Sequence, residues 1–189
     1  MSAPSTAPAI TLPGLEPAVE TAKKVVAPFT IMIDTREQNP YLFQGLRADS
    51  DKGSLPLEVP TQRYGLPNGD YMVLGLPQMV VERKSKEDLY SSISQRRENF
   101  EQRLSRMQEE LRWAAIVVEA EVASLLSAPP AFSQFSPKAL NRTILAWSQR
   151  YPRVHWFCLP SREFAESYTF RLLERWWRDH KNDDKLTEL

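Results

Sequence analysis

Cysteine and histidine are scarce in this sequence of 189 residues. Cys158 is the single cysteine, and His155 and His180 are the two histidines. An internal disulfide and a zinc site of the usual histidine and cysteine kind are therefore both excluded. A metal bound by this chain would be held mostly by oxygen atoms, which favours magnesium or manganese. A lone cysteine is also typical of a reducing intracellular setting, cytoplasmic or nucleoid-associated in a bacterium or virus and nuclear in a eukaryote.

Glycine is sparse as well, with six residues, and neither a Gly-x-x-x-x-Gly-Lys loop nor a Gly-x-Gly-x-x-Gly turn is present. The best-known signatures of nucleotide hydrolysis and dinucleotide redox chemistry are thus missing. No apolar run reaches the ~18 residues of a transmembrane helix, and the N-terminal residues lack the pattern of a secretory signal. Lysine plus arginine equals aspartate plus glutamate at 24 each, so a polyanion would need a local cluster of positive side chains.

The composition changes along the chain and divides it into three parts. Residues 1–27 are rich in proline, alanine, serine and threonine, and they predict a disordered tail. Residues 28–182 contain enough apolar segments for one folded domain. Residues 183–189 are expected to form a flexible C-terminus.

The apolar pattern of the domain predicts an α/β fold. "FTIMIDT" indicates a buried strand ending at Asp34, and "LEVPTQ" a short strand in an otherwise irregular connection over residues 38–63. Two strands within 69–84 are expected to form a hairpin, and a single helix is expected from about 86 to 111. A strand at "WAAIVVEA", a short helix near 121–127, a helix over 137–150, a strand at "RVHWFCL" and a final helix capped by Ser161 follow. This order predicts a mixed β-sheet with helices on both faces.

Three consecutive charged residues end the apolar run "MVV" of the predicted hairpin. Because side chains alternate along a strand, Glu82 and Lys84 share one face and Arg83 points to the other. Asp70 begins the partner strand, so antiparallel pairing brings it close to Glu82. Two carboxylates beside an ammonium can hold a divalent cation, and the lysine can orient or deprotonate a water for phosphodiester hydrolysis. The alternative interpretation is a solvated strand end after an ordinary turn, with Asp88 a first-turn residue favoured by the helix dipole.

The segment "GDYMVLGLPQMVVERKSKEDLYSSI" resembles the core motif of the XPF-type (ERCC4-domain) structure-specific DNA endonucleases. That family carries a Gly-Asp turn followed by Glu-Arg-Lys-x-x-x-Asp, and "IMIDTRE" is similar to its first-strand motif Asp-x-Arg-Glu. The resemblance implies a restriction-endonuclease-like core with a mixed β-sheet flanked by helices. The matching residues are Asp34, Arg36, Glu37, Gly69, Asp70, Glu82, Arg83, Lys84 and Asp88.

The resemblance also implies a function, namely hydrolysis of branched or flapped DNA in repair or recombination with Mg²⁺ or Mn²⁺. Asp70, Glu82 and Asp34 would be metal ligands, and Lys84 and Glu37 further catalytic groups. Asp88 would give structural support. The positive side chains expected to bind nucleic acid are Arg36, Arg83, Lys86, Arg96 and Arg103. For Arg83 a structural role is favoured over a phosphate contact, because its side chain faces away from Glu82.

The sequence departs from the family pattern in lacking the glycine-centred hairpins of the tandem helix-hairpin-helix modules that often follow the nuclease. This leaves open whether a separate DNA-binding partner protein supplies such a module. A homodimer is expected because family nuclease domains often pair, and because Phe170, Trp176 and Trp177 cannot all face one core stripe. Base stacking by these aromatics is the alternative.

Two other functions stay open from the sequence. A catalytically silent, nuclease-like DNA-binding or scaffold subunit is disfavoured by the intact Asp70, Glu82 and Lys84. A nuclease of the same fold with another nucleic-acid target is not distinguished by any residue.

Overall fold

The structure of the protein is a computed structural model that describes residues 24–48, 54–131 and 133–183. The predicted tail and C-terminus lie outside the described residues, apart from residues 24–27 and residue 183. Strand β1 (Val25–Val26) lies within the segment predicted as a tail, and Ala27 is buried. Among the described residues, no helix is long and apolar enough to cross a membrane.

A six-stranded mixed sheet forms the centre of the fold, in the order β5-β2-β6-β7-β8-β9. The β6–β7 pair is antiparallel, with Tyr71 opposite Val81, which confirms the predicted hairpin. β7, β8 and β9 run parallel to one another, as do β2 and β5. The strands are β2 (Ile31–Asp34), β5 (Thr61–Tyr64), β6 (Tyr71–Val73), β7 (Leu76–Lys84), β8 (Trp113–Val118) and β9 (Val154–Cys158).

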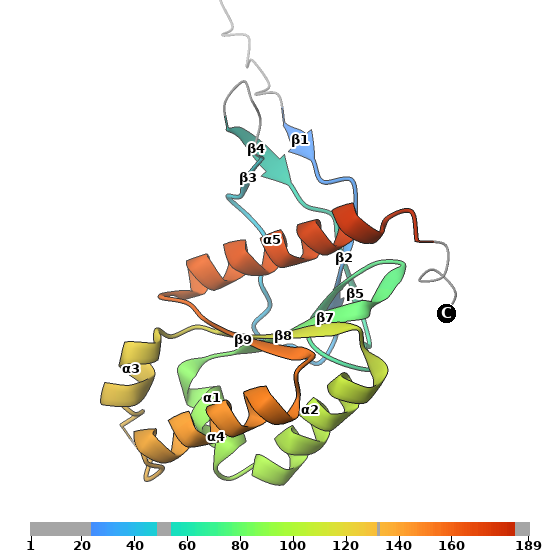
Figure 1. The fold of residues 1–189 in the computed structure, drawn as a ribbon. Helices are drawn as coiled ribbons and strands as arrows, with labels where there is room; N and C mark the ends of the chain where they lie inside the picture. Colours follow the sequence, from blue (N-terminus) through green and yellow to red (C-terminus); the bar gives the residue numbers. More distant parts are fainter. Residues whose placement is uncertain (1–23, 49–53, 132, 184–189) are drawn as a thin grey trace, which may run out of the picture.

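Helices cover both faces of this sheet, as the sequence predicted (Figure 1). One face carries α5, and α1, α2 and α4 lie against the other (Figure 1). Alternation along the strands supplies a separate apolar core to each face. Val80 belongs to the core beneath α1, α2 and α4, whereas its neighbour Val81 belongs to the core beneath α5. The helices are α1 (Lys86–Ile93), α2 (Arg97–Glu110), α3 (Val122–Ser127), α4 (Pro137–Arg150) and α5 (Arg162–His180).

The prediction of a single helix from 86 to 111 is wrong, because the helix is interrupted between α1 and α2. Ser94 ends α1, and its backbone N–H and its hydroxyl both donate to the carbonyl oxygen of Tyr90. The break lets two short helices each turn an apolar stripe onto the same core, through Ile93 in α1 and Leu104 in α2. The apolar spacing alone did not reveal this break, because the apolar stripe of α2 continues the helical period of the stripe of α1.

Aromatic residues surround α5 because this helix packs against the large sheet and also against the segment leading from β1 to β2. Both contacts belong to one apolar core. In that segment the Phe29 ring stacks on Phe170 and Trp177, with ring centroids 5.8 and 5.5 Å away. Phe170 and Trp177 therefore pack inside the molecule, and the exposed aromatics of α5 are Phe164 and Tyr168.

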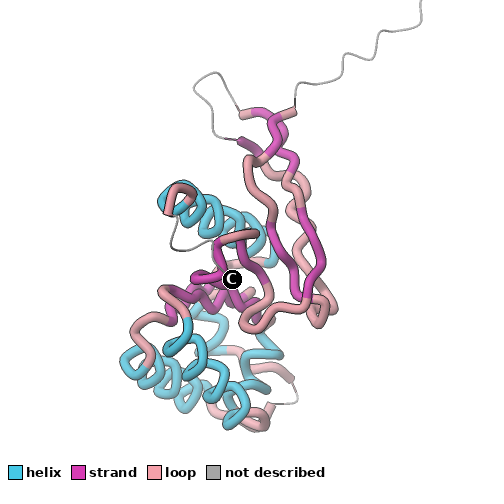
Figure 2. Tube along the Cα trace, turned by 90° about the vertical axis from the view of Figure 1, so that its right-hand side faces the viewer, coloured by secondary structure: helices cyan, strands magenta, loops and turns pink. Residues whose placement is uncertain are grey.

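A small three-stranded sheet, in the order β1-β4-β3, lies on the far side of α5 when seen from the large sheet (Figure 2). β3 comprises Arg47–Ala48 and β4 comprises Leu55–Glu58. The short strand predicted at "LEVPTQ" is thus two strands, β4 and β5, separated by Val59 and Pro60.

Candidate active site

A cavity of about 730 Å³ opens where β2 and β7 end and β6 begins. The 34–39 segment and the 67–70 turn form part of its wall, and α2 forms another part. Most of the residues predicted from sequence to form the site line this one cavity. They are Asp34, Arg36, Glu37, Asp70, Glu82, Arg83, Lys84, Asp88, Arg96 and Arg103. Lys86 is the exception, since its ammonium donates to the Ser124 hydroxyl at 2.9 Å.

The hairpin brings the two central acids together. The backbone N–H of Asp70 donates to the carbonyl oxygen of Val81 at 2.8 Å, directly before Glu82 in β7. The Asp70 carboxylate accepts a 2.7 Å bond from the backbone N–H of Arg83. Burial, and next the nearby charge of Glu82, raise the pKa of Asp70 well above its usual value. Two acids this close favour either a shared proton or a bound cation.

Lys84 lies between two carboxylates on the same side of β7. Its ammonium is 2.6 Å from Oε1 of Glu82 and 3.0 Å from Oδ2 of Asp88. Burial by itself would lower the pKa of Lys84, but the charges of Glu82 and Asp88 outweigh burial and raise it. This direction favours the protonated side chain, which suits charge neutralisation and water orientation.

The acid pair fits a divalent cation by its donor atoms and by one unused oxygen. Oε2 of Glu82 is buried and has no hydrogen-bond partner within the described part of the chain. A buried carboxylate oxygen without a partner is costly, and a cation would satisfy it. Magnesium is commonly held by one or two protein carboxylates, with water and phosphate oxygens completing its shell. No group of three or more histidine, cysteine or acidic side chains arranged for a metal occurs in residues 24–48, 54–131 and 133–183.

Asp34, the predicted third ligand, already has an arginine partner. The Nε of Arg36 donates to both Asp34 oxygens, at 3.1 and 2.9 Å, and the backbone N–H of Arg36 adds a bond of 2.9 Å. Burial raises the pKa of Asp34, but the bonds from Arg36 outweigh it and keep that pKa below its usual value. The backbone of Asp34 lies beside that of Asp70, whose carbonyl oxygen accepts the Asp34 backbone N–H at 2.9 Å, and both residues line the cavity. The role of Asp34 as a metal ligand stays a prediction.

Arg83 faces away from the acid pair, as the alternation predicted. Its guanidinium makes two bonds to Glu119, from Nε to Oε1 at 2.7 Å and from Nη2 to Oε2 at 2.8 Å. Nη1 lies 3.6 Å from Oε1 of Glu37. Only 11% of the Arg83 side chain is exposed, which favours the structural role over a contact to DNA.

Helix α2 brings positive and amide side chains to the cavity wall. Nη1 of Arg103 is 2.5 Å from Oε1 of Glu82, and Arg96 pairs with Asp88. The side chains of Arg96 and Arg103 are 52% and 48% exposed, so both can reach a ligand in the cavity. Asn99, Gln102 and Arg106 line the same wall.

Sequence reasoning missed these three α2 side chains and Glu119. The α2 residues recur at helical spacing with Arg96 and Arg103, which was a usable signal. Glu119 ends the apolar run "IVV" much as Glu82 ends "MVV", and β7 and β8 pair in parallel. The sequence therefore showed that Glu82 and Glu119 each end an apolar run of a buried strand, and this pattern could have drawn attention to Glu119.

Comparisons with known proteins identify the family and the fold of this chain. The model of the ERCC4 domain matches residues 33–172, more than half of the chain. No curated protein sequence matches. XPF from Aeropyrum pernix superposes with a TM-score of 0.55 at 20% identity, over 82% of this chain and 66% of that protein.

A second structure, XPF from Aeropyrum pernix in complex with DNA, gives a TM-score of 0.55 at 20% identity, over 81% of this chain and 65% of the other. The chain thus spans about two thirds of the length of these structures. At this identity the likeness shows the fold, and it confirms the restriction-endonuclease-like α/β core predicted from the sequence.

Proposed function

The chain belongs to the ERCC4 domain family, and on that basis we propose that it is a divalent-metal-dependent endonuclease that hydrolyses phosphodiester bonds in branched or flapped DNA, in repair or recombination. One observation carries this proposal. Asp70, Glu82 and Lys84 meet in one cavity, and a buried oxygen of Glu82 has no partner among the described residues. The DNA bound to Aeropyrum pernix XPF supports DNA as the ligand.

Each side chain of the site has a task in this proposal. Asp70 and Glu82 would hold Mg²⁺ or Mn²⁺, which supplies charge to polarise the phosphate and to acidify a water. Protonated Lys84 fixes the Glu82 carboxylate and offsets the charge that develops on the phosphate oxygens. Glu37 would serve as a further acid of the site.

Binding of the DNA backbone is assigned to the exposed arginines around the acids. Arg36, Arg96 and Arg103 line the cavity and would contact phosphates, which position the strand without reading its sequence. Lys86 would contribute only if it left Ser124. A second copy of the chain, and a separate DNA-binding protein, are proposed as partners.

A cleavage panel tests the activity. We expect wild-type protein with Mg²⁺ or Mn²⁺ to cleave labelled flap, fork or four-way junction DNA faster than plain duplex or RNA. Asp70→Asn should remove cleavage while the melting temperature stays at or above the wild-type value, because a raised pKa marks a carboxyl whose charge is unfavourable in the fold. Cleavage by wild type in excess chelator, or by Asp70→Asn at the wild-type rate, would contradict the proposal. Equal rates on duplex and branched DNA would leave a nuclease with another target.

A further inference from the structure

Glu119 lies beside the charged end of β7, at the end of the neighbouring strand β8. It is the first residue after β8, and its backbone N–H donates to the carbonyl oxygen of Lys84 at 2.9 Å. Its side chain is 9% exposed and does not line the cavity. The residue therefore holds Lys84 through the backbone from a position that substrate does not reach.

The Glu119 carboxylate also holds two arginines. Arg83 donates to both of its oxygens, and Nη1 of Arg162, at the start of α5, donates to Oε1 at 3.0 Å. The ring of Tyr41 lies near both guanidinium groups, with its centroid 5.7 Å from Cζ of Arg83 and 4.9 Å from Cζ of Arg162. A buried carboxylate that accepts two bonds from Arg83 and one from Arg162 has one well-defined orientation.

These contacts continue to the acids of the cavity. The side chain of Arg83 donates to the Glu119 carboxylate, and its backbone N–H donates to the Asp70 carboxylate at 2.7 Å. Nη2 of Arg162 donates to the carbonyl oxygens of Asn39 and Pro40, at 2.9 and 2.8 Å. The segment that follows Glu37 is therefore fixed by the same carboxylate.

We propose that Glu119 is a positioning residue for the proposed nuclease reaction. It sets the orientation of Asp70 and Lys84 through Arg83 and its own backbone, and it holds the 37–41 segment through Arg162. This inference rests on the proposed function for its effect on cleavage, whereas the coupling of Glu119 to Asp70 is a property of the fold.

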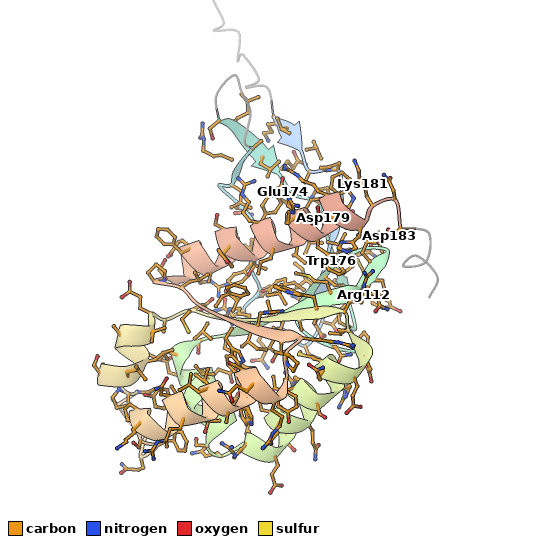
Figure 3. All side chains as sticks on the ribbon, in the orientation of Figure 1. Arg112, Glu174, Trp176, Asp179, Lys181 and Asp183 are labelled. Atoms are coloured by element: carbon orange, nitrogen blue, oxygen red, sulfur yellow. The ribbon has the colours of Figure 1, made fainter. Side chains whose placement is uncertain are left out.

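Glu119→Gln removes the charge while keeping the size of the side chain. Glu174→Gln is a matched control, because Glu174 also holds two arginines, Arg171 and Arg178, each at 2.8 Å. Glu174 lies on α5 among the labelled side chains of Figure 3 and does not line the cavity.

We expect Glu119→Gln to lower the single-turnover cleavage rate at saturating enzyme by about tenfold or more, since small displacements of catalytic groups are costly. The dissociation constant for DNA should stay within about twofold of wild type, because Glu119 touches no ligand. Glu174→Gln should change neither quantity. In the combined Arg83→Gln and Glu119→Gln variant the rate should fall no further than in the worse single variant, as expected for residues acting in one chain of contacts.

Hydrogen exchange of the Arg83 amide supplies a readout that needs no cleavage. We expect its protection to fall in Glu119→Gln more than that of other β7 amides, and to be unchanged in Glu174→Gln. If wild type cleaves no substrate, the proposed function fails, and this measurement still decides whether Glu119 fixes the Arg83–Asp70 bond. Unchanged Arg83 protection overturns the inference, as does a rate equal to wild type in an active enzyme.

If Glu119→Gln does not fold, Arg162→Gln takes its place, because that side chain is 31% exposed. A several-fold loss of rate with unchanged DNA affinity is then expected, and no loss overturns the inference.

Discussion

Lys84 and Arg103 both contact the same oxygen of Glu82, yet their surroundings differ. The Lys84 side chain is 7% exposed and also pairs with Asp88. Arg103 is 48% exposed and reaches Glu82 from the surface of α2. A buried lysine is held in one place, whereas an arginine at a cavity mouth can exchange a carboxylate for a phosphate. The two cations are therefore expected to act in different steps.

The first prediction separates binding from chemistry. Lys84→Ala should remove cleavage and leave the dissociation constant for DNA nearly unchanged. Arg96→Ala combined with Arg103→Ala should raise that dissociation constant and largely spare single-turnover cleavage at saturating enzyme. Filter binding and rapid-quench kinetics measure the two quantities. Arg112→Ala, an exposed arginine outside the cavity, is the control.

Salt dependence checks the same assignment. An arginine that binds one phosphate of duplex DNA contributes about 0.9 to the slope of log K against log salt, so its replacement by alanine should flatten the slope by that amount. If the double arginine variant binds as tightly as wild type at every salt concentration, this wall of α2 is a solvated face and DNA docks elsewhere.

At the scale of elements, the turn before β6 decides where Asp70 lies. Gly69 has a φ of +67°, and a Cβ at this position would be 2.8 Å from Cβ of Val80. An L-residue here would meet both an unfavourable backbone conformation and a neighbouring strand. The glycine of the Gly-Asp motif is thus required by the close approach of the turn to β7.

Gly69→Ala should destabilise the fold by about 1–3 kcal/mol and displace Asp70. Gly75→Ala is the matched control, since Gly75 has a φ of +80° but a Cβ there would have nothing within 4 Å. Urea unfolding should show a larger loss for Gly69→Ala, and Mn²⁺ titration should show weaker binding in that variant only. Equal stability losses would mean that β7 yields to the extra methyl group.

For the whole molecule, zero formal net charge means that no overall field attracts DNA. The positive side chains that matter are those gathered at the cavity, where Arg36, Arg96 and Arg103 offset the acids. Affinity for DNA is accordingly expected to depend on a few local contacts and, in a longer assembly, on a partner surface.

The proposed homodimer has a candidate surface on α5. Phe164 is 64% exposed and Tyr168 is 36% exposed, and the Tyr168 ring lies 5.1 Å from that of Phe157 in the edge strand β9. Replacing both Phe164 and Tyr168 by serine should shift sedimentation from dimer toward monomer, because apolar side chains at the centre of an interface carry most of its energy. Leu74→Ser, at an apolar residue in the β6–β7 turn that is 54% exposed, should leave the mass unchanged. A wild-type monomer at high concentration would contradict the dimer.

The sequence determined the local geometry of this site. Strand alternation placed Glu82 and Lys84 on one face of β7 with Arg83 on the other, and the turn at Gly69 predicted that Asp70 would meet Glu82. Both statements depend on backbone periodicity within a hairpin, which neighbouring residues fix by themselves. The α/β order and the cap of α5 at Ser161 followed from the same kind of local pattern.

Only the tertiary structure decided which groups lie opposite one another. Arg83 pairs with Glu119 because β8 lies beside β7, and Glu82 receives Arg103 because the break after α1 lets α2 turn back over the sheet. The aromatic residues around α5 are likewise explained by the segment leading from β1 to β2, whose Phe29 ring stacks on Phe170. Periodicity tells which way a side chain points from its own element. The partner it meets depends on how distant elements pack, because burial energy depends on the whole core rather than on any one segment.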